Sequence, residues 1–388
     1  MARCGLATVP LYRPACGAQR IVAVMVWTAA LLVGAATSGA RAERAASAGV
    51  YVRQDTDHTR VISPRLHLHA PVGDDSSHVD LAYAVDVWTS ASVDIVASAS
   101  APVTEQRDEL NVAVDRVFGD LRLAAAYRYS TEPDYESHGG SLSLSWDLAN
   151  KAFTLAWSLG GSADTVGRAG DTEFAEAVNT LNTGLALTQV LDPDTLLQLI
   201  YDFGYSRGYL ASAYRFVSFG SPGPCRSTAP LCRPEENPRE RMRHAIALRA
   251  RRAWSSEWSS GASYRAYLDD WGLISHTARV DLAWAPQPKA TLALGYRFYT
   301  QNAADHYAAQ YQPSDLALTY FTRDKELSPL TSHRIGLELD WVWELGTGQA
   351  GLLTALEVAT TFYRYADFPM LASATALEVT FVTGMEWE

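Results

Sequence analysis

The stretch HRIGLELDWVWEL, residues 333–345, places an apolar side chain at every second position. The apolar series is Ile335, Leu337, Leu339, Trp341, Trp343 and Leu345, and most positions between them are charged or glycine. Side chains of a β-strand point alternately to opposite faces, so this pattern predicts a strand with one apolar and one polar face. The apolar face would pack on a second sheet in a soluble sandwich, and would meet lipid in a membrane barrel.

The same two-residue period recurs along the chain. It is found at 79–87, 121–129, 142–147, 153–159, 278–284, 291–299 and 377–387. Hydrophobic residues make up 48% of the sequence, yet the mean hydropathy is only −0.09, because they are interleaved with polar residues. Helical periodicity is hardly found beyond the first 42 residues. The sequence therefore predicts an all-β protein.

The first 42 residues have the pattern of a secretory signal peptide. An apolar run, 21–32, follows three arginines and is followed by small residues, with Ala40 and Ala42 in cleavage register. A membrane anchor is the alternative, but the run is shorter than the roughly 18 to 20 apolar residues that a spanning helix needs. We expect export, with cleavage after Ala42.

The charge balance of the exported chain is acidic. The full sequence has a net charge of −11, and the first 42 residues contain four arginines and no acidic residue, so the mature chain has −15. An acidic surface of this size argues against general nucleic-acid binding.

The links between the predicted strands alternate in length. Short links lie near 118–120, 148–151, 191–194, 255–256, 286–289 and 346–348, and longer links at 131–137, 162–177, 209–239, 302–330 and 365–371. A short link at 269–272 is the exception, since a long loop is expected there. Short turns at one end and long loops at the other are the plan of an outer-membrane barrel.

We therefore predict a transmembrane antiparallel up-and-down β-barrel of about sixteen strands, with fourteen as the alternative. The barrel is expected to span 60–388, and its weakly patterned strands are 60–71 and 93–101. Residues 43–59 are predicted to form an N-terminal periplasmic or plug segment. An even strand number places both ends of the mature chain on the periplasmic side.

Tryptophans near the strand ends predict interfacial aromatic girdles, because indoles prefer the headgroup level of a membrane. They are Trp146, Trp157, Trp254, Trp284, Trp341, Trp343 and Trp387. The alternative, a sandwich core filled by aromatics, would not need the small polar opposite face of each strand.

Cys225 and Cys232 are the cysteines that remain after removal of the signal peptide, and they lie in a stretch rich in proline, glycine and serine. In an oxidising compartment this spacing predicts a loop disulfide. Half of a metal site is the alternative, but no other Cys or His is near in the sequence.

The stretch RERMRHAIALRARR predicts a basic ladder on one strand face. By strand parity Arg239, Arg241, Arg243, Arg249 and Arg251 share a face that would line the lumen. Such a ladder would favour anions. Pairing with lumenal acids on neighbouring strands, for example Asp202 or Asp269, is the alternative, and the two roles are compatible.

Candidate metal ligands are sparse. Asp55 and Asp57 are too few for calcium, which takes six to eight oxygens. His67 and His69 share a strand face, which could hold a divalent metal. Because no third ligand is found, we predict that they line the lumen. Enzyme motifs such as G-x-S-x-G, H-E-x-x-H, C-x-x-C and a phosphate loop are absent from the sequence. We predict no metal, no cofactor and no enzymatic activity.

Two segments near the mature N-terminus resemble an uncharacterised family of bacterial exported proteins that look like outer-membrane β-barrels. The first, 50–64, contributes Tyr51, Asp55, Asp57, Ser63 and Pro64, and the second, 83–110, contributes Asp86, Ser90, Ser92, Asp94, Ser98, Ser100, Glu105 and Arg107. The tail at 363–379 is similar to the closing hairpin of that family. The resemblance implies a barrel and no established activity. The chain departs from the usual barrel-insertion signal, because Glu388 follows Trp387.

These patterns favour a passive channel for small solutes in the outer membrane, in contact with lipid and lipopolysaccharide and inserted by the barrel-assembly machinery. A structural or docking barrel for a periplasmic or cell-surface partner is the alternative. A membrane-embedded hydrolase is the least favoured hypothesis, since it would need Ser and His side chains in contact at one strand level. The solute and the oligomeric state do not follow from the sequence.

Overall fold

The computed structural model describes residues 44–90, 103–220, 225, 229–345 and 350–387. The predicted signal peptide lies outside these residues, as do Ser92, Asp94, Ser98, Ser100 and the predicted strand at 93–101. Within the described residues no helix is long and apolar enough to cross a membrane.

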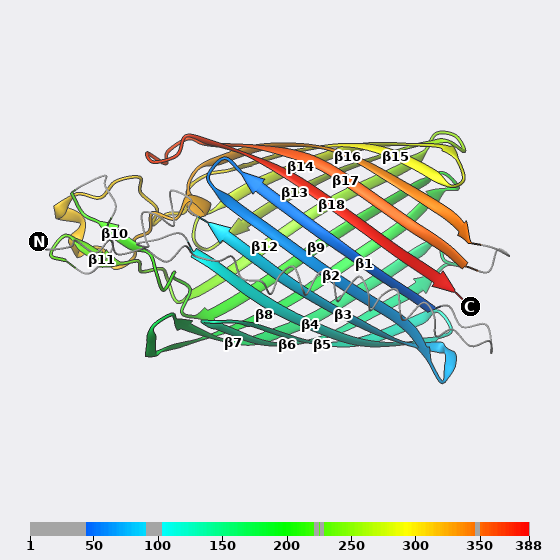
Figure 1. Cartoon of the computed structure of the whole chain (residues 1–388), viewed down its shortest axis with the longest axis horizontal. Helices are drawn as coiled ribbons and strands as arrows, with labels where there is room; N and C mark the ends of the chain where they lie inside the picture. The colour runs from blue at the N-terminus through cyan, green and yellow to red at the C-terminus, as the bar shows by residue number, and fades with distance from the viewer. Residues whose placement is uncertain (1–43, 91–102, 221–224, 226–228, 346–349, 388) are drawn as a thin grey trace, which may run out of the picture.

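The described chain forms a closed antiparallel barrel of sixteen strands, which confirms the predicted fold (Figure 1). Each strand pairs with its neighbours in chain order, and β1 closes the barrel against β18. The strands are β1 (Arg44–Asp55), β2 (Thr59–Val72), β3 (Asp74–Ser90), β4 (Val103–Phe118), β5 (Leu121–Glu132), β6 (Tyr135–Leu148), β7 (Phe153–Arg168), β8 (Asp171–Asp192), β9 (Thr195–Gly208), β12 (Glu240–Ala253), β13 (Trp258–Asp269), β14 (Ile274–Gln287), β15 (Ala290–Gln301), β16 (Leu330–Leu345), β17 (Ala350–Tyr365) and β18 (Ser373–Trp387).

The first strand corrects one prediction. Residues 44–55 are not a plug or periplasmic segment but β1, which pairs with β18 from Arg44–Trp387 to Asp55–Ala376 and with β2 along its other edge. The physical reason is closure, because an open edge at β18 would leave backbone groups unpaired in lipid. The weakly patterned segment 60–71 is part of β2, so the count of sixteen is reached without 93–101.

Two of the predicted long links are also wrong. Segments 131–137 and 162–177 lie mostly within strands, and β5–β6 and β7–β8 are joined by two-residue turns. The long links that remain, 209–239 and 302–329, lie at the end of the barrel opposite the C-terminus (Figure 1). We call this the loop end, and the end with the strand termini at 44 and 387 the terminal end.

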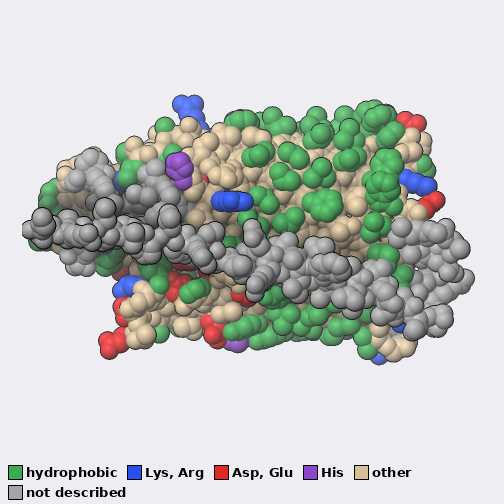
Figure 2. Space-filling view, in the orientation of Figure 1, with side chains coloured by type: hydrophobic (Ala, Val, Ile, Leu, Met, Phe, Trp, Pro, Cys, Tyr) green, Lys and Arg blue, Asp and Glu red, His purple; other side chains and the backbone are tan. Residues whose placement is uncertain are grey.

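The outer surface of the barrel is apolar. On β16, Ile335, Leu337, Leu339 and Trp343 are exposed on one face, in agreement with the alternation of 333–345. Comparable residues on the other strands stand outward, and the face seen in Figure 2 shows them as a broad hydrophobic band. The apolar face of each strand therefore points away from the barrel, as in a barrel surrounded by lipid.

The predicted tryptophan girdle lies at the terminal end alone. Trp146, Trp284, Trp341, Trp343 and Trp387 are near the terminal ends of their strands, Trp157 is near the start of β7, and Trp254 is in the β12–β13 turn. The indoles of Trp254 and Trp343 are 64% and 50% exposed.

The two long links fold together as a cap at the loop end. The cap contains the hairpin β10 (Phe216–Ser218) and β11 (Cys232–Pro234) and the 3₁₀ helices η2 (Pro313–Ala317) and η3 (Lys325–Leu327). Its small apolar core is Val217, Phe219, Tyr311 and Phe321. Cys225 and Cys232 form the predicted disulfide, with Cα atoms 6.0 Å apart.

Candidate functional site: a charged lumen

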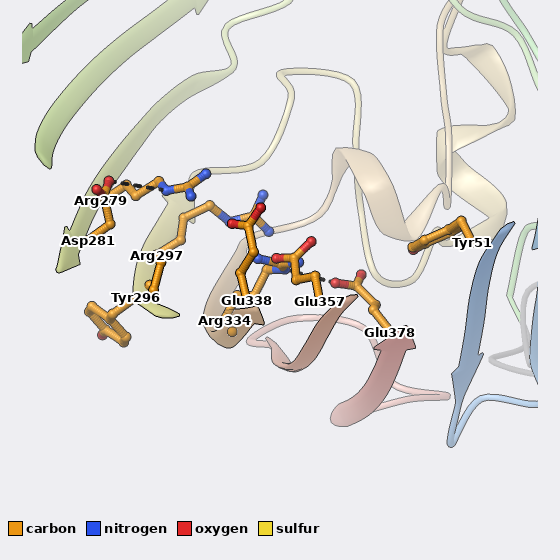
Figure 3. Close-up of a pocket in the computed structure, with 12 residues that line it drawn as sticks. Tyr51, Arg279, Asp281, Tyr296, Arg297, Arg334, Glu338, Glu357 and Glu378 are labelled. Carbon is orange, nitrogen blue, oxygen red and sulfur yellow. Dashed lines mark hydrogen bonds and ion pairs between the residues drawn. The ribbon is translucent and has the colours of Figure 1, made fainter. Parts of the chain in front are cut away.

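The inner face of the barrel is charged along β12 to β18 and β1. A pocket of about 420 Å³ on this wall is lined by residues of β1, β14, β15, β16, β17 and β18 (Figure 3). The sequence places these side chains inside because their strands have apolar residues at the alternate, outward positions.

Four arginines lie at one pairing level of this wall. Arg249 is opposite Ser263, Ser263 is opposite Arg279, Arg279 is opposite Arg297, and Arg297 is opposite Arg334. We call Arg249, Arg279, Arg297 and Arg334 the arginine row. Like charges directly opposite on neighbouring strands repel, so the row raises the local positive potential of the lumen.

Carboxylates lie next to the row, displaced toward the terminal end. The Arg334 guanidinium donates from Nη2 to Glu357 Oε1 at 2.7 Å and from Nε to Glu378 Oε2 at 2.8 Å (Figure 3). Arg279 Nε is 3.9 Å from Asp281 Oδ1. The row is thus only partly neutralised, since Arg297 Nε is buried and has no hydrogen bond among the described residues.

Glycines keep the space beside these charges open. A Cβ atom at Gly336 would lie 3.2 Å from both Arg334 Nη1 and Glu357 Oε1, and one at Gly261 would lie 2.6 Å from Asp281 Oδ1. Side chains at these positions would displace the charged groups, so the glycines allow the pocket to exist.

The wall formed by β6 to β9 is lined mainly by small side chains. The pocket on this side is lined by Ser141, Ser158, Gly160, Asn182, Gly184 and Gly204 of these strands, together with Asp202 and with Arg243, Arg265 and Tyr267 of β12 and β13. The lumen therefore has arginines on one wall and small polar groups on another, which gives a field across the pore.

The arginine ladder predicted on β12 faces inward, but most of its members are paired. Arg239 is bound to Glu176, Arg241 to Asp269, and Arg251 to Asp281, with closest N–O distances of 3.0, 2.5 and 3.3 Å. Arg243 donates to Ser206 Oγ at 2.8 Å, and Arg249 belongs to the arginine row. Pairing with Asp269, the structural alternative, is therefore present for Arg241, whereas Asp202 has no ion pair with the ladder among the contacts of the described residues.

The cap is held together by a buried carboxylate. Glu235 has a fully buried side chain and accepts hydrogen bonds from Arg215 Nη1 at 3.1 Å, from the Ser212 backbone N–H at 2.8 Å and from the Thr322 hydroxyl. Arg215 also donates to Asp324 at 3.0 Å. This hub joins the links 209–239 and 302–329.

Other contacts fasten the cap to the barrel. Lys325 Nζ donates to Asp57 Oδ2 at 2.8 Å, in the turn between β1 and β2. His306 Nε2 lies 3.0 Å from Asn237 Oδ1, and its ring packs edge-on against Trp271. Burial lowers the pKa of His306, and the nearby Arg241 guanidinium lowers it further. The cap is thus a packed structure at the mouth of the lumen.

The family-like residues are spread over wall and cap. Tyr51 lines the lumenal pocket, Asp57 anchors the cap, Asp86 is paired with Arg107, and Asp55 Oδ1 accepts from the Thr59 backbone at 2.8 Å. The remaining described positions do not join them in one site. Ser63 is buried and faces inward, Pro64 is opposite Val50, Ser90 ends β3, and Glu105 lies near the start of β4.

One group of described residues has the spacing of a metal site. Ligand atoms of Glu105, Glu132 and Asp134 lie within 4.8 Å of one another near the loop end. Acidic groups of this kind are common without an ion, and this one has no further ligand to distinguish it. His67 and His69 both contact Asp80 Oδ1, at 2.9 and 3.0 Å, so an aspartate already occupies the space between them.

The sequence reasoning missed Arg279, Arg297, Arg334, Glu357 and Glu378. Each lies in a segment whose alternation predicts an inward face, so parity could have found the individual residues. Their grouping could not be found, because it depends on the register between five strands.

Comparisons with known proteins support the barrel and its family. A solved bacterial polysaccharide outer membrane secretin has a TM-score of 0.51 at 9% identity, covering 89% of this chain and 98% of that chain. OccK3 from Pseudomonas aeruginosa has a TM-score of 0.45 at 9% identity, covering 89% and 96%. The likeness to the secretin concerns the fold alone. No curated protein matches the sequence. The family model described as "Protein of unknown function (DUF3570)" matches residues 16–184 and 173–353, and the chain belongs to this family.

Proposed function

We propose that the protein is a passive outer-membrane channel for small solutes, with a preference for anions. The observation that supports this proposal is the arginine row, which places four guanidinium groups along one line of directly paired positions on the inner wall. Arginines fixed on the wall of a pore raise the local concentration of anions and repel cations.

The arrangement suits passage better than tight binding. The carboxylates of Glu357 and Glu378 neutralise Arg334, so the row attracts a solute without holding it by all four charges. Conduction requires attraction that is weak enough for release. The proposed role is therefore a conduit and not an enzyme.

The cap sets the width of the extracellular mouth in this proposal. Asp324, Glu326 and Leu327 of the cap line the same pocket as Arg241 and Arg243 of the wall. A solute entering from the loop end would pass this constriction before it reaches the arginine row. The loop end faces outward, and the signal peptide and barrel-assembly machinery bring the chain to the outer membrane.

The test is single-channel conductance of the refolded mature protein in a planar bilayer under a salt gradient. We expect stable current steps and a reversal potential whose sign shows that anions pass more readily than cations. The variant R249Q/R279Q/R297Q should lose this preference while it still conducts. Arg207→Gln is the matched control, because Arg207 is on the outer face beside Glu240 and is 71% exposed in its side chain. Anion preference that survives in the triple variant would refute the role of the row.

A docking barrel is the second candidate, and exposed apolar side chains on the cap favour it. Leu231, Leu318 and Tyr320 are 46%, 45% and 42% exposed, at the end of the molecule away from the apolar band. A folded barrel that conducts no ions in any state of the cap would favour this second role.

A further inference from the structure

Four tyrosine–histidine pairs recur on the outer face of the barrel. Each tyrosine hydroxyl lies within hydrogen-bond distance of a histidine Nδ1 on the next strand. The pairs and their O–N distances are Tyr127–His138 at 2.7 Å, Tyr201–His244 at 2.9 Å, Tyr264–His276 at 2.7 Å and Tyr296–His333 at 2.8 Å. We call this set the Tyr–His belt.

The pairs have identical registers. Tyr201 is opposite Ile246, Tyr264 is opposite Ala278, and Tyr296 is opposite Ile335, and in each case the histidine is two residues closer to the loop end. Tyr127 is opposite Gly140 and is paired with His138 in the same way. A geometry repeated on four hairpins is a property of the surface and not of one local contact.

The belt lies at one level of the tilted barrel. From Tyr201 the register leads through Ile246 to Ala266, and a step of two residues toward the terminal end reaches Tyr264. The same route through Ala278 and Phe298 reaches Tyr296. Strands of a barrel are staggered because they are tilted, so positions related by a constant step around the wall lie at similar height.

The belt is separated from the tryptophans by the height of the apolar band of the barrel. His244 and Trp254 are ten residues apart in sequence, as are His333 and Trp343, and both pairs face outward. At about 3.4 Å per residue and a tilt of about 40°, ten residues span roughly 25 Å, the height of the apolar band of a membrane barrel. The tryptophans thus mark one interface, and the imidazoles lie at the headgroup level of the opposite one.

The tyrosine fixes which ring nitrogen faces the headgroups. The phenol hydroxyl is the stronger donor of the pair, so Nδ1 accepts and the neutral ring has its hydrogen on Nε2. A protonated ring donates from both nitrogens. Nε2 is therefore a donor in either state. Phe203 and Phe298 pack on His244 and His333 with ring centroids 5.2 Å apart, which further fixes these two rings.

Three of the four histidines form one sector. His244, His276 and His333 lie on the neighbouring hairpins β9–β12, β13–β14 and β15–β16, and their Nε2 atoms have no hydrogen bond among the contacts of the described residues. His138 differs, because its Nε2 lies 2.9 Å from Glu136 Oε1. The sector thus presents three oriented donors at the level where lipid phosphates lie.

We propose that His244, His276 and His333 form a docking surface for the phosphate groups of lipopolysaccharide, the phosphoglycolipid of the bacterial surface leaflet. The inference rests on the proposed outer-membrane location with the loop end outward, and it does not depend on conduction. A hydrogen bond from an N–H group to an ionised phosphate oxygen is stronger than one between two neutral groups.

The test measures binding of purified lipid A to the full mature protein in detergent by native mass spectrometry. We expect diphosphoryl lipid A to bind at least about tenfold more tightly than its dephosphorylated form, and H244L/H276L/H333L to remove most of this difference. The matched control is H67L/H69L/H78L, three histidines of the inner face, and it should bind as the wild type does. A heat-modifiable gel shift verifies that each variant is folded.

A second variant separates the loss of binding from misfolding of the histidine variant. Y201F/Y264F/Y296F keeps the aromatic surface and removes the hydroxyls that orient the rings, so it should show an intermediate loss. Equal binding of both lipid A forms to the wild type, or full binding by the folded histidine variant, would overturn the proposal. Phosphatidylglycerol that competes as well as lipid A would overturn lipopolysaccharide as the occupant.

Discussion

Arg297 lies directly opposite Arg334 across β15 and β16, and the Nε atom of Arg297 is buried without a hydrogen bond among the described residues. Neither feature stabilises a fold, because like charges repel and a buried donor without a partner loses its hydration. A position that lowers stability in two ways is expected where function requires the charge.

The first prediction is that Arg297→Met stabilises the barrel. Removing the repulsion and the unsatisfied donor should raise the free energy of unfolding by about 0.5–2 kcal/mol, while anion preference decreases. Urea unfolding of the protein in lipid vesicles measures the first effect, and the reversal potential measures the second. A variant that is both less stable and equally selective would show that Arg297 serves packing alone.

The second prediction concerns the carboxylates that Arg334 contacts. The double change E357Q/E378Q leaves the guanidinium without an ionised partner, and its side chain is only 20% exposed. We expect a loss of about 1–3 kcal/mol in the free energy of unfolding and a stronger anion preference. Glu344→Gln is the matched control, because Glu344 pairs with Lys289 at 2.9 Å where both side chains are exposed, and should change stability little.

The third prediction uses a glycine at the loop end of β9. Gly208 has a φ of +136°, and a Cβ atom there would lie 2.0 Å from the carbonyl oxygen of Ala177. Gly208→Ala should therefore lower stability by at least about 2–3 kcal/mol, through backbone strain and a steric clash. Gly119→Ala is the control, since its φ is +62° but nothing lies within 4 Å of the added Cβ. Equal losses in the two variants would mean that the clash is relieved by movement of β8.

Individual strands show which parts of the fold can be predicted from the sequence. The segment 333–345 predicts β16 because large apolar side chains alternate with charges, and lipid makes this pattern obligatory. Residues 43–59 are predicted as a periplasmic or plug segment because they precede the first firmly alternating strand, and RAASAG at 44–49 has small side chains without strong alternation. Its place in the wall follows from barrel closure, a property of the whole chain.

The prediction of a long link at 162–177 is wrong for another reason. Its sequence, SADTVGRAGDTEFAEA, has the composition of a polar loop, but it forms the end of β7, the start of β8 and the turn between them. A hairpin that extends beyond the membrane needs no apolar outer face, so the alternation that identifies a strand in lipid is absent there. The arginine row and the Tyr–His belt could not be predicted either, because both depend on the register between strands.

The fourth prediction is that the disulfide stabilises the cap and not the barrel. Cys225 and Cys232 close a short loop within the cap, and such a link contributes about 2–3 kcal/mol to the local structure. C225S/C232S should leave the heat-modifiable gel shift of the barrel unchanged and increase proteolysis of the cap. If C225S/C232S also lowers the urea concentration at which the barrel unfolds, the cap and the barrel unfold together.

The last prediction is that acid loosens the cap through His306. Burial and the Arg241 guanidinium lower the pKa of this imidazole, while Asp305 and Asp269 act in the opposite direction. Because the pKa is lower in the folded cap than in an unfolded chain, the folded cap binds the proton less well. The stability contributed by neutral His306 is therefore fully present above the ordinary histidine pKa of about 6.5 and is lost as the pH falls through the lowered value.

The measurement is proteolysis of the cap and channel conductance between pH 7.5 and pH 4.5. We expect faster cleavage and larger or more frequent current steps at the acidic end. In the wild type, His306 Nε2 lies 3.0 Å from Asn237 Oδ1. The variant His306→Gln keeps a hydrogen-bond donor toward this oxygen, but the glutamine side chain does not titrate. The variant should thus resemble the neutral wild type at all pH values. A wild type and a variant that respond equally to acid would assign the effect to another group of the cap, such as the buried Glu235.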